Sequence, residues 1–466
     1  MVENFDVIVI GAGPAGYVAA IRAAQLKQKV AIVDKQWLGG VCLNVGCIPS
    51  KSLLRNAEIA HILRERGKEF GFSFDNLKLD YGVAIKRSRQ NSDRLTKGVG
   101  FLMKKNAITV YMGEAHLSKP TTVTVTDKDG KATELSAKNI IVATGASAAV
   151  PGAWKVDGQK VVTYLEAIVQ EKLPKSVIVI GSGAIGVEFA TVWSSYGVDV
   201  TVVEMLPRLV PLEDEEISKE LEKEFKKRGI KCLVGNKVEA VEATKTGVKV
   251  TVSAGGKTTP LEAEQALVAI GFRPNSKGLG LEQVGVKINE RGFVEINEKM
   301  QTSVQNIYAI GDVTGKLMLA HVGSAMGIVA AENIAGAETV TLDYEMMPRT
   351  TYCQPQIASF GLTEAQAKER GYNIKIGRFP FQVNGKALGL GDYAGWVKIV
   401  MDEKYGEILG AHMIGPEVTE LLPELTLAHL MELTPHEIAR NVHAHPTLSE
   451  VLMEAAHGAE GSPIHI

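Results

Sequence analysis

Short apolar runs alternate with helix-like stretches along this 466-residue chain. The first run, Asp6–Ile10, is followed by a helix-like stretch that extends to Leu26 and by a second run, Val30–Asp34. The same order returns later, where runs at Ser176–Ile180 and Val200–Glu204 enclose a second helix-like stretch. Strand-length apolar runs that alternate with helical patterns are typical of βαβ units in a parallel sheet. The pattern therefore predicts an α/β fold that contains two copies of one unit.

Further runs extend this prediction to the rest of the chain. Ile140–Gly145 and Ile307–Asp312 both have the pattern of a strand that ends in a glycine turn. The alternating stretches Thr121–Thr126 and Val248–Val252 are typical of hairpin strands, one after each βαβ unit. From about Tyr344 the pattern changes to mixed strands and helices without a third copy of the unit, which fits an oligomer interface.

Each βαβ unit carries a glycine-rich turn, called a cradle below, between its first strand and its helix. The glycines are Gly11, Gly13 and Gly16 in the first copy, and Gly181, Gly183 and Gly186 in the second. In a dinucleotide-binding turn the first glycine makes the bend, the second lets the backbone approach the pyrophosphate, and the third lets the helix pack on the strand. An acidic residue that can bind ribose hydroxyls ends the second strand of each copy, Asp34 in the first and Glu204 in the second. Two cradles predict two dinucleotides, which we interpret as a tightly held flavin and an exchangeable nicotinamide.

The nicotinamide is expected to be NAD. A carboxylate at Glu204 would repel the 2′-phosphate of NADP, and no arginine follows it until Arg208. We interpret Arg208, which comes directly after a proline, as a surface residue.

Cys42 and Cys47 follow the first cradle in the glycine-rich run Gly39–Lys51. The chain has 4 cysteines, too few for a scaffold stapled by disulfides, so this pair suggests a dithiol that exchanges electrons with the cofactor. In an undistorted helix two such Cα atoms lie roughly 8.6 Å apart, whereas a disulfide spans roughly 4.4–6.8 Å. A bond between them therefore requires a distorted helix, which Gly46 and its neighbours permit. Two unrelated core cysteines and a zinc site stay open as alternatives, although zinc would need further cysteine or histidine ligands nearby.

Composition and charge exclude several classes of protein. The formal net charge is −2, and no basic run interleaved with aromatic residues predicts a nucleic-acid partner. No stretch approaches the roughly eighteen apolar residues of a membrane span, and no residue cluster predicts a metal site. The chain enters a strand almost at its first residue, which leaves no room for a signal peptide. We therefore expect a cytoplasmic protein, or a matrix or stromal one if a transit peptide has been removed.

With two cradles and the Cys42–Cys47 pair between them, the chain resembles the FAD-dependent pyridine nucleotide–disulfide oxidoreductases. The resemblance covers essentially the whole chain, and its other motifs are Ala143–Gly145, Gly271–Asn275, Ala309–Val313 and His443–Glu450. Within the family the chain is most similar to the branch that oxidises dihydrolipoyl groups, the E3 components of 2-oxoacid dehydrogenase complexes.

The resemblance implies two Rossmann-like dinucleotide-binding domains and an α+β C-terminal dimerisation domain. The expected boundaries are 1–147 for the first part of the FAD-binding domain, 148–272 for the NAD-binding domain, 273–344 for the central second part of the FAD-binding domain, and 345–466 for the dimerisation domain. It also implies a homodimer that holds one FAD tightly in each subunit and uses NAD⁺ as a substrate.

The resemblance assigns catalytic roles to four residues. His445 would deprotonate the substrate dithiol, and Glu450 would hold the other imidazole nitrogen. The substrate thiolate would attack Cys42, which frees Cys47 beside the flavin. Imidazole suits the role of base because it titrates near neutral pH. In this family the disulfide and the base of one active site come from different subunits, so a monomer would be inactive.

The resemblance also assigns further residues to the binding of the two cofactors. They include a lysine near flavin N5 and a glutamate that pairs with it beside the nicotinamide. On the FAD side they are Gly11, Gly13, Gly16, Asp34, Lys51, Ala115, Thr144, Gly145, Asp312 and Ala320. On the NAD side they are Gly181, Gly183, Ile185, Gly186, Glu188, Glu204, Val238 and Gly271.

The chain also departs from the family pattern, at Asp34 where Glu is usual, at Val41 where Thr is common, and at Phe272 where Arg is frequent. The expected partners are lipoylated E2 proteins of 2-oxoacid dehydrogenase complexes or the glycine-cleavage H protein. A glutathione reductase would prefer NADP, and a mercuric reductase would carry an extra cysteine pair near its C-terminus. A flavoprotein subunit that serves mainly in docking is the remaining alternative.

Overall fold

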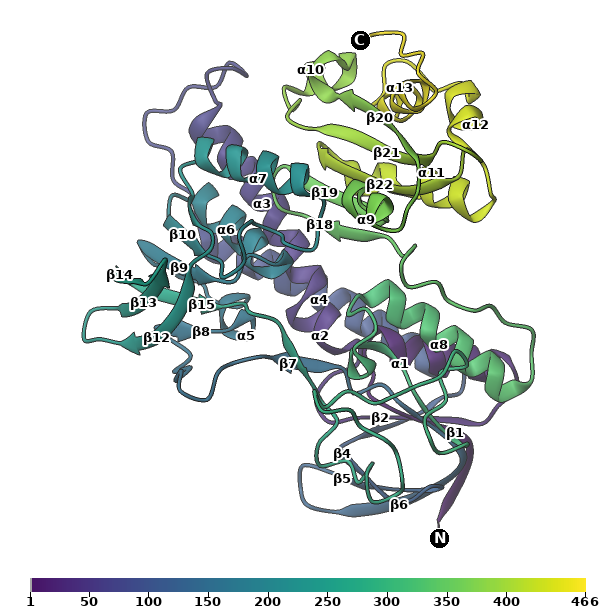
Figure 1. The fold of residues 1–466 in the computed structure, drawn as a ribbon. Coiled ribbons are helices and arrows are strands. Elements are labelled where there is room, and N and C mark those ends of the chain that lie inside the picture. The colour runs from purple at the N-terminus through teal and green to yellow at the C-terminus, as the bar shows by residue number, and fades with distance from the viewer. Residues whose placement is uncertain (1) are drawn as a thin grey trace. The chain divides into compact units, whose positions relative to one another are not determined.

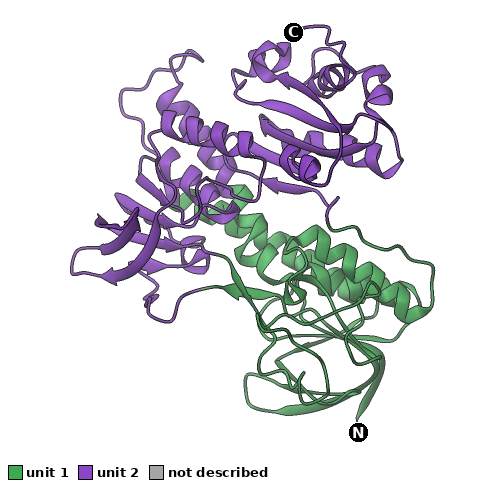
Figure 2. Ribbon diagram, viewed as in Figure 1, with its two compact units in different colours: residues 1–52, 82–149, 271–344 green, residues 53–81, 150–270, 345–466 purple. Residues whose placement is uncertain are grey.

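A computed structural model describes residues 2–466, which form two compact units (Figure 2). Unit 1 consists of the described residues up to Ser52 together with Gly82–Ala149 and Gly271–Tyr344. Unit 2 consists of Leu53–Tyr81, Val150–Ile270 and Glu345–Ile466. The boundaries of the FAD-binding, NAD-binding and dimerisation domains stay a prediction, because these units group chain segments by their packing rather than by their cofactor.

Unit 1 is built on one mainly parallel sheet with the strand order β3-β2-β1-β6-β5-β4 (Figure 1). Strand β17 pairs with the end of β6 at Ile140–Val142, beyond the stretch of β6 that pairs with β5. The strands of this unit are β1 (Glu3–Ile10), β2 (Val30–Asp34), β3 (Thr109–Met112), β4 (Glu114–Lys119), β5 (Thr122–Thr126), β6 (Ala132–Val142), β7 (Ala146–Ala148), β16 (Phe272–Pro274) and β17 (Ile307–Ala309). Its helices are α1 (Pro14–Gln25), α2 (Gly40–Val45), α4 (Tyr81–Lys105, whose first residue belongs to unit 2), η1 (Gly311–Thr314) and α8 (Ala320–Ala335). The predicted strands at 6–10, 30–34 and 140–145 are therefore all present, and they are parallel.

Helices α1 and α8 pack side by side against this sheet (Figure 1). Their close approach depends on small residues, since a Cβ at Gly323 would lie 3.1 Å from the Ala15 side chain. An ion pair of 2.6 Å between Arg22 and Glu332 closes the far end of the helix pair. This packing holds the first cradle, which precedes α1, in a fixed position on the sheet.

Unit 2 contains a second parallel sheet with the strand order β11-β10-β9-β15-β8, and an antiparallel sheet β12-β13-β14. These strands are β8 (Val161–Val162), β9 (Ser176–Ile180), β10 (Asp199–Val203), β11 (Lys231–Leu233), β12 (Lys237–Ala243), β13 (Val248–Ala254), β14 (Lys257–Ala263) and β15 (Gln265–Val268). The accompanying helices are α3 (Cys47–Glu65, which begins in unit 1), α5 (Tyr164–Ala167), α6 (Ala184–Ser195) and α7 (Glu215–Lys227). The predicted second βαβ unit and its hairpin strand at 248–252 are confirmed.

The C-terminal part of unit 2 is an antiparallel sheet with the order β18-β19-β22-β21-β20, covered by helices (Figure 1). The elements are β18 (Arg349–Thr351), β19 (Gln356–Gly361), α9 (Glu364–Glu369), β20 (Ile374–Pro380), η2 (Phe381–Val383), α10 (Gly385–Leu390), β21 (Trp396–Asp402), β22 (Ile408–Gly415), α11 (Val418–Leu430), α12 (Pro435–Arg440) and α13 (Glu450–Ala459). Helix α11 contributes Leu422 and Leu425 to the core of this part. The core of this part lies between the sheet and the helices α11, α12 and α13.

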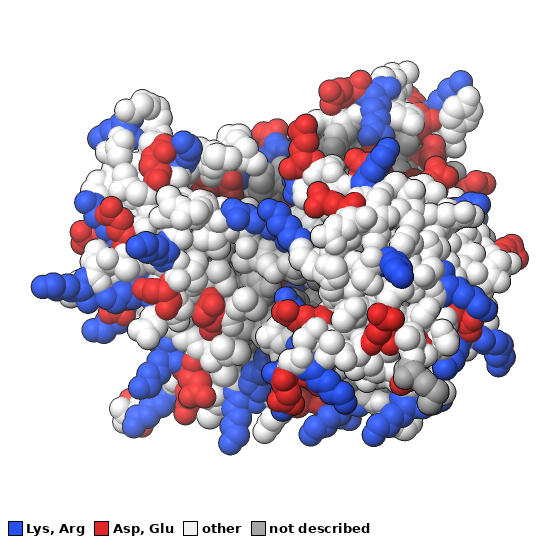
Figure 3. Space-filling model, turned by 90° about the horizontal axis from the view of Figure 1, so that it is seen from below, with Lys and Arg blue, Asp and Glu red and all other residues white. Residues whose placement is uncertain are grey.

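The surface carries basic and acidic side chains interspersed over the face seen in Figure 3, in keeping with the formal net charge of −2. Among the described residues 2–466, no helix is both long enough and apolar enough to cross a bilayer.

Candidate functional site

The first cradle has the geometry of a dinucleotide-binding turn. Gly11 has a φ of +107°, and a Cβ on Gly16 would overlap the carbonyl of Gly11, so neither position tolerates a side chain. Gly13 is the N-cap of α1, and no side chain at this position accepts a hydrogen bond from the N–H groups of the first turn. The helix N-terminus therefore keeps N–H groups available for a pyrophosphate.

The second cradle repeats this geometry in unit 2. Gly181 has a φ of +98°, and a Cβ on Gly186 would overlap the Gly181 carbonyl. A Cβ on Gly183 would meet no atom within 4 Å, so the approach to the N-terminus of α6 is open. Ile185 lies in the first turn of the same helix. Both cradles fit the dinucleotides that the family pattern implies.

The acidic residues at the ends of β2 and β10 bind their own cradles, which the sequence pattern did not reveal. Asp34 Oδ2 accepts a hydrogen bond of 2.7 Å from the Ala12 N–H. Glu204 Oε2 accepts bonds from the Ser182 N–H at 2.8 Å and from the Ser182 hydroxyl at 2.9 Å. A carboxylate oxygen accepts more than one hydrogen bond, so these contacts orient both groups and leave capacity for ribose hydroxyls.

The cysteine segment is attached directly to the first cradle. The Gly39 N–H donates to the Ala12 carbonyl at 2.8 Å, and a Cβ on Gly40 would lie in contact with Gly13. No side chain can therefore separate this segment from the pyrophosphate turn. The structure places the two cysteines beside the cofactor cradle of unit 1.

Cys42 and Cys47 form a disulfide across a break between two helices. Helix α2 ends at Val45, Gly46 has a non-helical backbone, and α3 begins at Cys47. The Cα atoms of the cysteines are 4.6 Å apart as a result, well inside the distance that a regular helix would impose. The Asn44 side chain donates to the carbonyls of Leu38 at 3.0 Å and Gly40 at 2.9 Å, which fixes the short helix α2.

The remaining candidates for FAD contact lie in unit 1. Thr144 donates its hydroxyl to the Asn275 carbonyl at 2.7 Å, and the Asn275 amide returns a bond of 3.0 Å to the Thr144 carbonyl. Gly145 has a φ of +70° and completes the turn after β6. Sequence reasoning missed Asn275 as a residue that joins the two parts of this unit, although it lies in the Gly271–Asn275 motif.

Asp312 gives an independent indication of a bound polyhydroxyl group. Burial alone raises the pKa of Asp312 to about 6, and no residue among the described 2–466 donates a hydrogen bond to its side chain. The Asp312 side chain is only partly exposed, and a desolvated carboxylate without a donor is costly, so this position fits a cofactor that brings hydroxyl donors. Ala320 begins α8, Ala115 lies in β4, and Lys51 is half-buried in α3.

The NAD-side candidates extend from α6 into neighbouring elements. Glu188 is 6% exposed, and its Oε1 accepts a hydrogen bond of 2.9 Å from the Tyr352 N–H. Val238 lies in β12, and Gly271, with a φ of +112°, follows β15 as the first residue of the returning unit 1 segment. Phe272 is half-buried in β16, so it forms part of a strand instead of a charged contact.

The C-terminal loop of unit 2 presents one histidine to solvent. His445 Nδ1 lies 2.9 Å from Glu450 Oε1, and the His445 side chain is 77% exposed. Burial pushes the pKa of Glu450 upward, but hydrogen bonds from the Thr447 N–H and from His445 outweigh it and hold this pKa below its usual value. His443, by contrast, is 3% exposed and its two ring nitrogens lie 2.8 Å from the Asn441 carbonyl and 3.0 Å from Glu424. His443 is therefore a structural histidine, whereas His445 has a free Nε2 edge.

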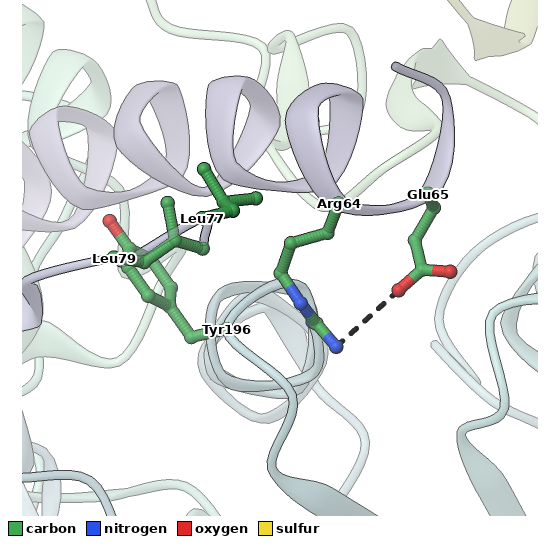
Figure 4. A pocket seen from close by; sticks show the side chains of 5 residues that line it. All are labelled: Arg64, Glu65, Leu77, Leu79 and Tyr196. Atoms are coloured by element: carbon green, nitrogen blue, oxygen red, sulfur yellow. Dashed lines mark ion pairs between the residues drawn. The ribbon is translucent and has the colours of Figure 1, made fainter. Parts of the chain in front are cut away.

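A cavity of about 440 Å³ lies at the opposite end of α6 from the second cradle (Figure 4). Arg64 at the end of α3 donates to the carbonyls of Ser194 at 3.3 Å and Ser195 at 2.9 Å, so it satisfies the C-terminus of α6. Its guanidinium also pairs with Glu65 at 3.4 Å. This cavity contains none of the candidate residues, and we interpret Arg64 as a helix-capping residue.

Comparisons with known proteins identify the family. A model described as pyridine nucleotide-disulphide oxidoreductase matches residues 5–327, and the corresponding dimerisation domain matches residues 347–456. The chain belongs to this family. Membership confirms the predicted oxidoreductase class, the use of FAD and NAD(H), and the presence of a C-terminal dimerisation domain.

Individual relatives match over nearly their full length. A protein of Mycobacterium leprae named dihydrolipoyl dehydrogenase is 54% identical over 99% of each chain, and one of Corynebacterium glutamicum with the same name is 50% identical over 100% of each. Among solved structures, LpdA from Mycobacterium tuberculosis has a TM-score of 0.91 at 29% identity, covering 97% of this chain and 99% of that one. A Cu(II) complex of the flavoprotein disulfide reductase RclA from Escherichia coli has a TM-score of 0.87 at 25% identity. The match covers 97% of this chain and 99% of that one. These matches confirm the predicted fold class.

Replacing Glu204 by Gln should weaken the preference for NAD⁺ over NADP⁺. The substitution removes the negative charge of a carboxylate that two hydrogen bonds from Ser182 hold beside the second cradle. We expect the ratio of kcat/KM for NAD⁺ to that for NADP⁺ to fall by about tenfold or more, because one uncompensated charge at a phosphate typically changes binding by this factor. The measurement is steady-state kinetics with both nucleotides. Glu262→Gln, an exposed charge on β14, is the matched control, and equal ratios in the two variants would contradict the assignment.

Proposed function

We propose that the protein oxidises dihydrolipoyl groups to lipoyl groups and transfers the two electrons through FAD to NAD⁺, as a dihydrolipoyl dehydrogenase. The observation that carries this proposal is the disulfide between Cys42 and Cys47, hydrogen-bonded through its own segment to the first cradle. The names of relatives at 50–54% identity over nearly the whole chain support the same substrate.

The first step opens the protein disulfide. His445 accepts the proton of a substrate thiol at Nε2, and the thiolate attacks Cys42 Sγ. The bond from Cys42 to Cys47 breaks, a mixed disulfide forms between substrate and Cys42, and Cys47 leaves as a thiolate. Glu450 stabilises the imidazolium through Nδ1, which is the role of the carboxylate in a catalytic triad.

The second step closes the substrate disulfide. His445 releases the first proton to solvent and accepts the proton of the remaining substrate thiol, whose thiolate attacks the substrate sulfur of the mixed disulfide. Cys42 leaves, takes up the proton from His445, and the lipoyl group departs with its ring disulfide formed. Substrate has then lost two electrons and two protons, and the protein holds Cys42 and Cys47 in the reduced form.

FAD, when bound, would supply the acceptor for these two electrons and the donor of a hydride to NAD⁺. Lys51 and Glu188 would supply local charge for that transfer, as the family resemblance implies. The cradles around Gly13 and Gly183 would hold the two pyrophosphates. Asp312 would accept a hydrogen bond from a hydroxyl of the FAD chain.

The chain's own residues support a site shared by two subunits. His445 is exposed in the C-terminal loop of unit 2, whereas the disulfide lies in unit 1. The dimerisation domain at 347–456 includes this loop. We infer that His445 of one subunit serves the disulfide of the other in a homodimer.

The carrier of the dihydrolipoyl group is inferred from the reaction alone. Lipoylated E2 proteins of 2-oxoacid dehydrogenase complexes and the glycine-cleavage H protein both present this group, with no nucleic-acid partner involved. The cytoplasm remains the predicted location.

Purified, FAD-loaded protein tests the proposal when NADH formation is followed at several concentrations of dihydrolipoamide. Rapid formation of NADH with NAD⁺, and slow formation with NADP⁺, is the expected result. Reduction of glutathione disulfide by NADPH at a higher kcat/KM would favour the glutathione reductase alternative. Absence of every thiol-dependent turnover, together with tight binding to an E2 protein, would favour the docking alternative.

A further inference from the structure

The catalytic loop is held by a chain of hydrogen bonds that begins on another element. His445 Nδ1 is bound to Glu450 Oε1 at 2.9 Å, and Glu450 Oε2 accepts the Thr447 N–H at 2.8 Å. The Thr447 carbonyl in turn accepts a bond of 3.0 Å from Asn384 Nδ2. Three consecutive hydrogen bonds therefore connect Asn384, at the start of α10, to the imidazole of His445.

Asn384 is suited to this position by both ends of its amide. Its Oδ1 accepts the Ala387 N–H at 2.9 Å and so caps the N-terminus of α10, while its Nδ2 faces the Thr447 carbonyl. The side chain is almost fully buried, at 4% exposure. The orientation of the amide is fixed, because an oxygen must meet the N–H group and a nitrogen must meet the carbonyl. Serine or aspartate could cap the helix equally well but would supply no amide donor.

The contacts of the loop itself explain why an outside anchor is needed. The Thr447 hydroxyl donates to the Ala444 carbonyl at 2.7 Å and lies 2.9 Å from Ser449 Oγ, so it joins only residues of the loop. The His445 side chain is exposed and contributes little packing of its own. The position of the imidazole is therefore determined by Glu450 and by whatever holds Thr447.

We propose that Asn384 is a positioning residue for the dithiol-oxidising step, because it fixes the Thr447 carbonyl and through it the Glu450–His445 pair. The proposal rests on the proposed function, in which His445 is the base. Asn384 touches neither substrate nor cofactor. It determines where the base stands relative to the incoming thiol, and a displacement of the base of about 1 Å is enough to slow such a step strongly.

Asn384→Ser is the main test, because serine keeps the cap on α10 and removes the donor. Thr363→Ala is the matched control, since it removes the capping box of α9 in the same part of the molecule. The measurements are dihydrolipoamide-dependent reduction of NAD⁺, the single-turnover rate at which dihydrolipoamide alone reduces the bound flavin, and NADH-driven reduction of a quinone. The third reaction needs no base at His445.

We expect Asn384→Ser to lower the first two rates by about tenfold or more and to leave the quinone reaction within about a factor of two of the wild type. Thr363→Ala should leave all three reactions near the wild type. If Asn384→Ser cannot be purified folded, Asn384→Asp, which keeps the size and the cap, takes its place with the same expectation.

Dithiol rates in the Asn384 variant equal to those of Thr363→Ala would overturn the proposal. A parallel fall of the quinone reaction would overturn it as well, because it would indicate a general structural role. A wild-type protein that does not oxidise dihydrolipoamide at all would instead refute the proposed function, and this inference with it.

Discussion

Cys47→Ser should abolish the reduction of NAD⁺ by dihydrolipoamide, with a fall of at least about a thousandfold. A serine oxygen can form no disulfide with Cys42, so electrons from the substrate have no path to the cofactor. NADH-driven reduction of a quinone should persist, because it bypasses the cysteines and the cradles are unchanged. Steady-state assays of both reactions on the same preparation measure the effect.

The free cysteines provide the matched controls. Cys353 is buried and Cys232 is partly buried, and burial raises the pKa of both thiols, that of Cys232 to about 12. Cys232→Ser should therefore retain near-normal turnover.

Spectra of Cys42→Ser and Cys47→Ser test the order of the two cysteines. Long-wavelength thiolate–flavin absorbance is expected when Cys47 is retained, and its appearance only in Cys47→Ser would reverse their roles.

His445→Gln should lower dihydrolipoamide oxidation by roughly 10²–10⁴-fold, the usual contribution of a general base. Glutamine preserves size and polarity but cannot take up the thiol proton. Because the pKa of Glu450 is held below its ordinary value, Glu450 stays ionised throughout the range in which an imidazole titrates. Steady-state kinetics of dihydrolipoamide oxidation, with the variant and the wild type at the same pH, measures the effect.

His457→Gln, in α13 of the same unit, is the control for His445 and should leave the rate of dihydrolipoamide oxidation nearly unchanged.

Mixing His445→Gln subunits with Cys42→Ser subunits tests the shared site. If one subunit supplies the base and the other the disulfide, random re-association should restore activity to about a quarter of the wild type, since half of the dimers then contain one intact site of two. Complete inactivity of mixed dimers that are shown to form would place base and disulfide in the same subunit.

The architecture could be predicted because its signals are local. The strand at 6–10, the cradle from Gly11 and the strand at 30–34 lie within one short segment, and the second copy repeats them around Gly181. The disulfide could also be predicted from a short segment. Its formation required a helix break, and Gly46 provides that break between α2 and α3.

The hydrogen bonds that orient the site could not be predicted, because they join residues distant in the sequence. Asn384 reaches Thr447, and Arg64 caps the far end of α6 at Ser194 and Ser195. A lone asparagine or arginine has many solvated alternatives, so its sequence context gives no partner. Ser182 is an intermediate case, since it lies inside the second cradle motif. Its hydroxyl bond to Glu204 became evident only when both backbone positions were known.

The reading of individual histidines also depended on tertiary structure. His443 and His445 are two positions apart, yet one is buried against Glu424 and the other projects into solvent beside Glu450. In the sequence, only the family resemblance, through the motif His443–Glu450, distinguishes His445 from His443. The structure adds a physical reason, because only the exposed ring has a nitrogen free to meet a substrate thiol.

The most direct test of the central claim follows the redox state of all the cysteines during the reaction. Protein is mixed anaerobically with dihydrolipoamide, thiols are alkylated before and after the addition of NAD⁺, and the labelled peptides are identified by mass spectrometry. The account predicts that Cys42 and Cys47 become labelled with dihydrolipoamide alone and lose that labelling once NAD⁺ restores the disulfide, while Cys232 and Cys353 do not change. Formation of NADH while the Cys42–Cys47 disulfide stays intact would contradict it.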